Sequence, residues 1–326
     1  MVTRFLRKSS VVQWTLASLL VLALATPGAA DQKAVKRIVV FGDSLSDPGN
    51  AFALRKTQST PPYDTLDPLL IPESPYAKGG HHFSNGATWI EQFARPLGLA
   101  GSVRPAFRGL GTKAANYAVG GARAHEDGIN VNLSAQVNAF LADVGGTAPS
   151  DGLHVVEIGS NDIRDALAAA ASGGDPGALI KEALGEIGRN IGALHAAGAR
   201  KFLVWNTPNL RPTPAIRTLD IISPGAGQAV EVLGQAFNAG LDVLIGYLSM
   251  LPDIEIKRFD AYQLVNDMVA MPDDFGLEVV DAACVMPHIP PFECRTPDEY
   301  LFWDGIHPTR AVHAIIAHEA ASVLAH

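Results

Sequence analysis

The sequence contains few cysteines and has fewer basic than acidic residues. Its 326 residues include two cysteines, and 25 Lys and Arg stand against 33 Asp and Glu, for a formal net charge of −8. An acidic chain lacks the positive surface that binds nucleic-acid phosphates, so we expect no nucleic-acid partner. Two cysteines alone make a poor zinc site, and we expect neither a metal nor a cofactor.

The signatures of several enzyme classes are also absent. The sequence has no Gly-x-Ser-x-Gly elbow of the α/β-hydrolase type. It has no phosphate-binding loop, no dinucleotide-binding fingerprint and no His-Glu-x-x-His zinc motif. The adjacent histidines at 81 and 82, and His125 with its acidic neighbours, are interpreted as solvated loop residues rather than metal ligands.

A long apolar run occurs at the N-terminus. Basic residues within positions 4–8 precede a mostly apolar stretch at 11–25, and small residues follow at 28–30. This order is typical of a secretory signal peptide that is cleaved after Ala30. A membrane-spanning helix needs about 20 apolar residues, whereas this run is shorter and is followed by Pro27. We therefore expect a signal peptide over residues 1–30, a secreted or periplasmic mature protein, and no integral membrane segment in it.

The expected mature chain, residues 31–326, is interpreted as a single domain. Loss of the leader removes three positive charges and leaves 22 basic against 33 acidic residues. The motifs described below begin at residue 42 and end at 308, with no linker between them. In an exported protein, Cys284 and Cys294 predict a disulfide, which would contribute about 2.5–3 kcal/mol in the chain-entropy model. It would hold the proline-rich stretch just before the last motif.

Short β-branched runs alternate with helical patterns along this domain. Five runs predict buried strands, at 37–41, 115–119, 153–158, 201–205 and 254–259. Apolar residues at helical spacing predict helices over 179–194 and 230–244, and a last helix that begins near Thr309. This alternation predicts a parallel sheet with helices on both faces, a doubly wound α/β fold. Residues 55–86 fit neither pattern, and we expect this loop to be part of the substrate cleft.

Polar and glycine residues gather where the predicted strands end. Ser44 follows the first strand, Gly121 the second and Asn161 the third, while Asp304 and His307 precede the last helix. In a parallel sheet these ends meet at one edge, where ligands bind. Acyl transfer requires a nucleophile, a base, a group that orients the base, and donors for the oxyanion.

Each of these residues fits one of those roles. Ser44 is the candidate nucleophile, His307 the candidate base, and Asp304 the group that fixes the histidine tautomer. The N–H groups of Ser44 and Gly121 and the side-chain amide of Asn161 are the candidate oxyanion donors. Taken singly, each has an ordinary explanation: Ser44 suits a turn, Asp304-Gly305 is a common turn, and Asn161 could cap a helix. Their occurrence together, in order and at the ends of predicted elements, favours the catalytic interpretation.

Four segments resemble the successive blocks of the GDSL (SGNH) hydrolases. They are Phe-Gly-Asp-Ser-Leu-Ser-Asp at 41–47, Asn-Tyr-Ala-Val-Gly-Gly at 116–121, Gly-Ser-Asn-Asp at 159–162 and Asp-Gly-Ile-His-Pro at 304–308. The segment 83–86 and Trp89 resemble the longer bacterial and plant-type members. The resemblance implies catalytic roles for the serine, glycine, asparagine and histidine of the four blocks, and Gly121 is chosen over Gly120 because it lies five residues after Asn116. It also implies a three-layer, flavodoxin-like fold with a parallel sheet of about five strands.

The expected function is that of an exported, serine-dependent carboxylic-ester hydrolase. The resemblance allows an esterase, a lipase or a phospholipase, with a small-molecule or lipid ester as substrate. One alternative is a glycan O-acetyl esterase of the same fold. Another, from a different class, is an exported binding protein that has lost catalysis, against which the intact residues at all four positions argue.

Overall fold

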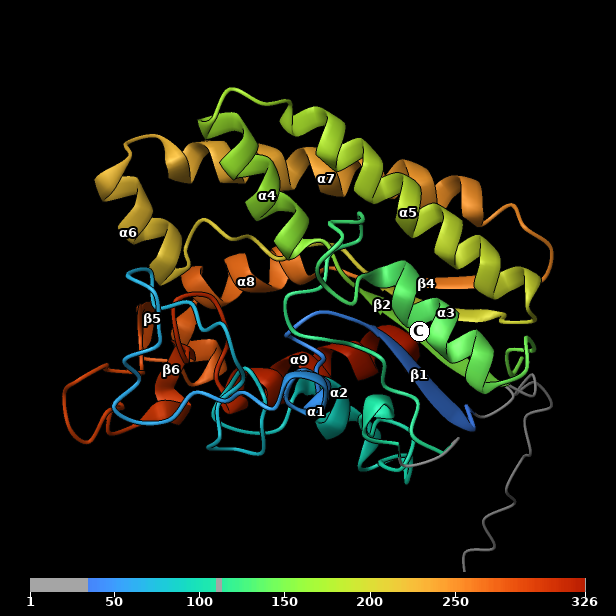
Figure 1. The fold of residues 1–326 in the computed structure, drawn as a ribbon, viewed down its shortest axis with the longest axis horizontal. Coiled ribbons are helices and arrows are strands. Elements are labelled where there is room, and N and C mark those ends of the chain that lie inside the picture. Colours follow the sequence, from blue (N-terminus) through green and yellow to red (C-terminus); the bar gives the residue numbers. More distant parts are fainter. Residues whose placement is uncertain (1–34, 110–112, 326) are drawn as a thin grey trace, which may run out of the picture. The chain divides into compact units, whose positions relative to one another are not determined.

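A four-stranded parallel sheet lies at the centre of the fold (Figure 1). The computed structural model describes residues 35–109 and 113–325, so the predicted signal peptide at 1–30 lies outside the described residues. The strands are adjacent in the order β1-β2-β3-β4, and each pairs with its neighbour in parallel. Their bounds are β1 Arg37–Gly42, β2 Gly152–Glu157, β3 Lys201–Trp205 and β4 Glu255–Phe259.

Helices cover both faces of this sheet (Figure 1). One face is covered by α3 Leu133–Asp143, α4 Ser160–Ala171, α5 Pro176–Ala196 and α7 Ala226–Leu248. The other is covered by α2 Trp89–Ala94, α8 Ala261–Ala270 and α9 Arg310–Ala325. Shorter elements complete the described part: α1 Asn50–Arg55, α6 Pro214–Ile222, the 3-10 helices Ala106–Arg108, Pro272–Phe275 and Pro297–Glu299, and a two-stranded parallel sheet of β5 Val279–Ala283 and β6 Tyr300–Phe302.

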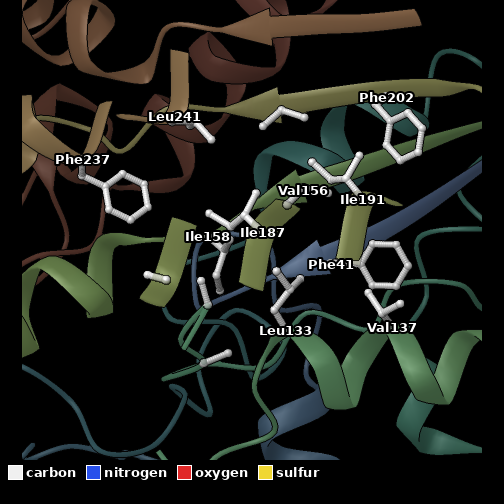
Figure 2. Close-up of a cluster of buried hydrophobic side chains, with 14 of the residues drawn as sticks. Phe41, Leu133, Val137, Val156, Ile158, Ile187, Ile191, Phe202, Phe237 and Leu241 are labelled. Carbon is white, nitrogen blue, oxygen red and sulfur yellow. The ribbon is translucent and has the colours of Figure 1, made fainter. Parts of the chain in front are cut away.

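The strands are apolar on both sides because both faces are buried. In β1, Val39 and Phe41 face the core beneath α3, α5 and α7, whereas Ile38 and Val40 face the core beneath α2 and α9. Figure 2 shows the first of these cores, in which Phe41 and Val156 from adjacent strands meet side chains of α3 and α5. The predicted three-layer α/β/α arrangement is therefore confirmed, as are the strands at 37–41, 153–158, 201–205 and 254–259 and the three predicted helices.

The strand predicted at 115–119 is wrong, and the sheet has four strands rather than five. The segment lies beside β1, because Val40 N–H donates to the Ala115 carbonyl and Tyr117 N–H donates to the Val40 carbonyl. It forms only isolated bridges, at Asn116. The reason is local: the Gly42 N–H, which would donate to the Tyr117 carbonyl in a continued ladder, donates to Gln136 Oε1 over 2.8 Å instead.

The edge segment at 115–119 and β2 lie on opposite sides of β1. The order in which the chain adds segments to the sheet therefore reverses at β1. Ligands in open α/β sheets bind beyond the carboxyl ends of strands at such a switch point. Ser44 follows β1, Gly121 follows the edge segment, and Asn161 opens the helix that follows β2. The topology thus brings these residues to the same edge.

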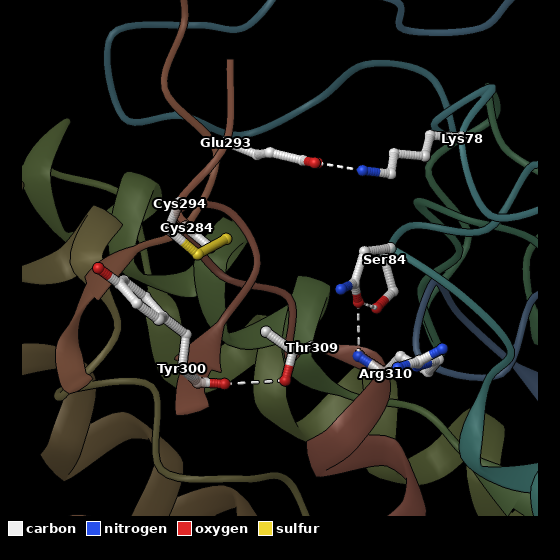
Figure 3. The surroundings of a disulfide bond; sticks show 9 residues. Lys78, Ser84, Cys284, Glu293, Cys294, Tyr300, Thr309 and Arg310 are labelled. Atoms are coloured by element: carbon white, nitrogen blue, oxygen red, sulfur yellow. Dashed lines mark hydrogen bonds and ion pairs between the residues drawn. A yellow bond between two sulfur atoms is a disulfide. The ribbon is translucent and has the colours of Figure 1, made fainter. Parts of the chain in front are cut away.

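The loop at 55–86 has no helix or strand beyond the end of α1, as its sequence predicts. Its aromatic residues Tyr63 and Tyr76 are buried against Trp303 and the Cys284–Cys294 disulfide, which the structure contains as expected (Figure 3). An ion pair between Lys78 and Glu293 joins this loop to the disulfide-closed segment. The loop is therefore anchored to the region that carries Asp304.

The described residues belong to one compact unit. No helix within residues 35–109 and 113–325 combines the length and apolar character needed to cross a bilayer.

Candidate active site

Ser44, His307 and Asp304 form a continuous chain of hydrogen bonds. His307 Nε2 lies 2.9 Å from Ser44 Oγ, and its Nδ1 lies 2.8 Å from Asp304 Oδ2. A proton on Nδ1 donates to the carboxylate, which leaves Nε2 to accept the serine hydroxyl proton. His307 and Asp304 are buried. The structure therefore brings together three residues that are up to 263 positions apart in the sequence.

The backbone around Asp304 fixes its carboxylate in place. Its Oδ1 accepts the N–H groups of Ile306 and His307, as in a short turn. Gly305 is required there, because a Cβ would lie 2.0 Å from the carbonyl oxygen of Leu69. The carboxylate is thus oriented before it meets the imidazole.

Tyr76 is a further partner of this carboxylate that the sequence motifs do not reveal. Its hydroxyl donates to Asp304 Oδ2 over 2.9 Å. Burial, together with the adjacent Asp304 charge, raises the pKa of Tyr76 well above its usual value, so the hydroxyl keeps its proton. The aromatic content of the loop at 55–86 was the available signal, although it did not single out this residue.

Gly120 and Gly121 have different surroundings. The Gly120 N–H donates to Asp47 Oδ2 over 2.8 Å, so it is already in use. Among the described residues, the N–H groups of Gly121 and Ser44 have no hydrogen-bond partner. Gly121 also has a φ of 86°, in the region that favours glycine. These observations favour Gly121 over Gly120 as a backbone donor to a ligand.

Asn161 lies in the first turn of α4 and does not cap the helix. The N-cap position is Gly159, which has no side chain. Instead, Asn161 Nδ2 donates to the Ala122 carbonyl over 3.0 Å, and its Oδ1 accepts from Arg164 Nη1 over 3.1 Å. The arginine fixes which end of the amide is the oxygen, and one amide N–H remains for another acceptor. The capping explanation of Asn161 is therefore wrong.

His125 is buried, contrary to the expectation that it is a solvated loop residue. Its Nδ1 lies 2.7 Å from Asp162 Oδ1, and this hydrogen bond raises the pKa of His125 above its ordinary value. His82 is buried as well, where its Nε2 pairs with Glu91 over 2.8 Å. Both histidines have protein partners that their sequence neighbourhood did not predict. Three or more His, Cys, Asp or Glu side chains that could share a metal ion are not found in the part of the chain that the structure describes.

Two carboxyl groups near the proposed nucleophile are buried: Asp43, which directly precedes Ser44, and Glu157, the last residue of β2. Burial raises the pKa of Asp43 to about 6, and burial with the nearby Asp43 raises the pKa of Glu157 well above its usual value. Asp43 Oδ1 accepts the Leu45 N–H over 3.1 Å. Asp43 Oδ2 and Glu157 Oε2 have no hydrogen-bond partner among the described residues. A glutamate within an apolar strand run was the sequence signal for this pair, and it was missed.

An apolar pocket opens at the predicted site. Its cavity volume is about 70 Å³, and Ser44, Asn161 and His307 lie on its wall. None of the residues 55–86 lines it, so the expectation that this loop forms the cleft is wrong for this pocket. The loop contacts the catalytic candidates instead: Tyr76 donates to Asp304, and the ring centroid of Phe83 lies 5.4 Å from that of His307.

Comparison with known proteins identifies the family of this chain. The family of GDSL-like lipases and acylhydrolases matches residues 38–320. A GDSL esterase/lipase of Arabidopsis thaliana is 27% identical over 86% of this chain and 83% of its own length. The phosphatidylcholine-sterol acyltransferase of Aeromonas hydrophila is 26% identical over 96% of this chain and 97% of its own. Among solved structures, LAE5, an α/β hydrolase enzyme from the metagenome of Lake Arreo, Spain, is 13% identical with a TM-score of 0.47, covering 90% of this chain and 96% of LAE5. Because the family match extends over most of the sequence, the chain belongs to the GDSL-like lipase/acylhydrolase family and is a hydrolase of ester bonds.

Proposed function

We propose that this protein is an exported serine esterase in which Ser44 is the nucleophile, His307 the general base and Asp304 the group that orients the base. The observation that carries this proposal is the hydrogen-bonded sequence from Ser44 Oγ through His307 to Asp304. Ser44 Oγ and His307 Nε2 are at the distance that proton transfer between them requires, and Asp304 is at hydrogen-bond distance from the other ring nitrogen.

The reaction follows from these positions. Ser44 Oγ attacks the ester carbonyl carbon while its proton moves to His307 Nε2, and Asp304 stabilises the resulting imidazolium. His307 then gives this proton to the leaving alkoxide, so the alcohol departs and an acyl-enzyme remains. Water attacks the acyl-enzyme in the same way: His307 takes its proton and returns it to Ser44 Oγ as the acid is released.

The oxyanion of the tetrahedral intermediate would be stabilised by three donors. They are the N–H groups of Ser44 and Gly121 and the side-chain amide of Asn161. Among the described residues the two backbone N–H groups have no partner, and the Asn161 amide, which donates one N–H to Ala122, keeps the other. This supports the role, because a donor that is free in the resting protein needs no rearrangement when negative charge develops.

The domain assignment and the export of the protein are part of this proposal. The catalytic domain would span residues 31–326 after removal of a signal peptide at 1–30. The Cys284–Cys294 disulfide supports export, since disulfides persist in oxidising compartments. The pocket beside Ser44 is apolar, which supports an ester that carries a hydrocarbon chain. An O-acetylated glycan would require polar partners for its sugar hydroxyls along the wall.

The test is hydrolysis of p-nitrophenyl esters by the wild type and by Ser44→Ala. Loss of the nucleophile in a serine hydrolase costs on the order of 10⁶ in turnover, so the variant should be inactive while its melting temperature stays close to that of the wild type. A fluorophosphonate should label Ser44 in the wild type, as read by peptide mass. A folded Ser44→Ala protein with a tenth of wild-type activity would overturn the assignment.

A further inference from the structure

Arg164 brings a positive charge to the wall of the pocket beside Ser44. It lies one turn after Asn161 in α4, the helix that follows β2 (Figure 1). Its Nη1 donates to Asn161 Oδ1 over 3.1 Å, and Asn161 lies on the same wall. An ester whose carbonyl oxygen is bound by the Asn161 amide would therefore have the guanidinium as a neighbour.

Most donors of this guanidinium are unused. A guanidinium carries several N–H groups, and the bond to Asn161 is the single hydrogen bond that Arg164 makes within residues 35–109 and 113–325. Nor does it form an ion pair with a carboxylate in that part of the chain. The unused groups include Nε and Nη2, which lie side by side on one edge of the planar group. Such an edge matches the two oxygens of a carboxylate or a phosphate.

Arg123 shows how the same edge binds when it has a partner. Its Nε and Nη2 donate to the two oxygens of Asp165 over 2.8 and 3.1 Å. Its Nη1 donates to the Gly121 carbonyl over 2.6 Å. Asp165 directly follows Arg164 in the sequence, yet it pairs with Arg123. Both arginines thus lie beside proposed oxyanion donors, but only the charge of Arg123 is balanced by an ion pair in the described part of the chain.

The surroundings of Arg164 do not compensate its charge. Burial and the nearby Arg123 charge lower the pKa of Arg164, and the more distant carboxylates of Asp165, Asp67 and Asp43 offset this only in part. A charge that is shielded from water without a close counter-ion is unfavourable. The bond to the Asn161 oxygen does not require this charge, since a neutral N–H donor could make it. The charge of Arg164 therefore indicates an anionic ligand.

We propose that Arg164 binds an anionic group of the substrate, and that the protein acts on esters that carry a phosphate or a carboxylate close to the scissile bond. This inference rests on the proposed function of Ser44 and Asn161. The substrate anion would occupy the Nε and Nη2 edge and supply the counter-ion that Arg164 lacks. Because the anion is present before the reaction as well as during it, the interaction should act mainly on KM.

The test compares neutral and anionic esters that differ in one group. For the alcohol half of the ester, the pair is butyrylglycerol and butyrylglycerol phosphate. For the acyl half, it is p-nitrophenyl butyrate and mono-p-nitrophenyl succinate. At low ionic strength, kcat/KM of the wild type should be about tenfold or more higher for the anionic member of at least one pair, which corresponds to about 1.4 kcal/mol. The pair that shows this preference identifies the half that carries the anion.

Three variants test whether Arg164 causes the preference. Arg164→Gln removes the charge but keeps an N–H donor, and should abolish the preference through a higher KM for the anionic ester. Arg164→Lys keeps the charge without the planar fork, and should keep part of the preference. Arg189→Gln, at an exposed arginine of α5 outside the pocket wall, is the matched control and should keep the wild-type ratio.

An orienting role toward Asn161 alone gives a different result. Arg164→Gln would then change kcat/KM equally for neutral and anionic esters, so their ratio would stay at the wild-type value. That outcome would overturn the proposal, and so would a wild type without preference in either pair.

A binding measurement separates failure of this inference from failure of the catalytic proposal. In the Ser44→Ala background, glycerol phosphate or succinate should raise the melting temperature at constant ionic strength. The additional Arg164→Gln change should remove that rise. If Ser44→Ala stays active but an anion binds in this Arg164-dependent way, the catalytic proposal fails and the anion site stands. If Ser44→Ala is inactive, while neither anion binds and the ester ratio does not depend on Arg164, the anion site is wrong.

Discussion

The carboxylate of Asp162 lies 2.7 Å from Nδ1 of His125 and also accepts the backbone N–H groups of Ala124 and His125. These bonds join the segment that follows Gly121 to the first turn of α4, where Asn161 lies. Two of the three proposed oxyanion donors, Gly121 and Asn161, come from chain segments about 40 residues apart, and Asp162 is one of the side chains that hold these segments together. The position of these two proposed donors therefore depends in part on a residue that does not itself line the pocket.

Asp162→Ala should lower kcat about 10²-fold with a smaller change in KM, because a misplacement of about 1 Å near the reacting atoms has an effect of that size. Removal of the carboxylate also leaves two buried N–H groups without an acceptor, so the melting temperature should fall. Steady-state kinetics and thermal unfolding on the same sample give both values. Asp162→Asn keeps one acceptor oxygen and should recover part of kcat; equal kcat for the wild type and the alanine variant would refute the positioning role.

Tyr76→Phe should weaken the support of Asp304 without removing the carboxylate. The substitution deletes one hydrogen bond to a charged group, which contributes about 1.5–3 kcal/mol to stability. The aromatic ring still packs against Trp303, at a centroid distance of 5.7 Å, so the core is kept. We expect a lower melting temperature and a decrease in kcat of about tenfold, which corresponds to about 1.4 kcal/mol of transition-state stabilisation. Tyr63→Phe, in the same aromatic cluster, is the matched control and should leave kcat unchanged. An unaltered kcat in Tyr76→Phe would mean that the tyrosine serves the fold alone.

The buried pair Asp43 and Glu157 should make the protein less stable as the pH rises. Burial raises the pKa of both groups in the folded state, so the folded state binds more protons than the unfolded state above pH 4. Stability is then fully present below the unfolded pKa values and is lost as the pH rises through the folded ones, from about 4 to 6 for Asp43 and beyond that for Glu157. The nearby His307 and Arg164 act in the opposite direction on Asp43.

Glu157→Gln should flatten this dependence, because the amide keeps the shape of the protonated side chain and cannot ionise. The free energy of unfolding, measured with urea at pH 5 and pH 8, should fall less for the variant than for the wild type. The variant should be the more stable protein at pH 8. A steeper loss of stability in Glu157→Gln would show that Glu157 is ionised in the folded protein.

The parts of this molecule that the sequence could predict are those that depend on local pattern. An apolar run located β1, because a strand that is buried on both faces must be apolar throughout. Apolar residues at helical spacing located α5 and α9, because each of these helices buries one face against the sheet. The motifs singled out Ser44, Asn161 and His307 as candidates, since each follows or precedes an element at the edge where ligands bind in parallel sheets. Local pattern failed at 115–119, where the run has the composition of a strand but the distant Gln136 side chain takes the Gly42 N–H that would continue the ladder with β1.

Contacts between distant segments could not be predicted in this way. Tyr76 and Asp304 are 228 residues apart, and nothing in either neighbourhood specifies the other. The hydrogen bond of His125 with Asp162 also joins distant parts of the sequence. The residues next to His125 therefore gave no reason to expect that it is buried. The pocket depends on how α8 packs near α9, and its volume follows from side-chain packing rather than from any motif.

Two possible roles of Asn161 predict different effects of Asn161→Ala. If its amide donates to the developing oxyanion, Asn161→Ala should lower kcat by about 10²–10³, which is about 2.7–4 kcal/mol of transition-state stabilisation. The donor acts when negative charge forms, so KM should change little. If Asn161 served only the fold, the loss of its hydrogen bonds would cost about 1 kcal/mol of stability and leave turnover nearly intact. The structure favours the first outcome: Gly159 occupies the N-cap, and Arg164 holds the Asn161 oxygen so that the amide nitrogen lies beside Ala122. Arg164→Leu, which releases that oxygen, should reproduce a part of the kcat loss through misorientation of an intact amide. Turnover and melting temperature measured together on Asn161→Ala decide the matter, and a lowered melting temperature with unchanged kcat would remove Asn161 from the oxyanion site.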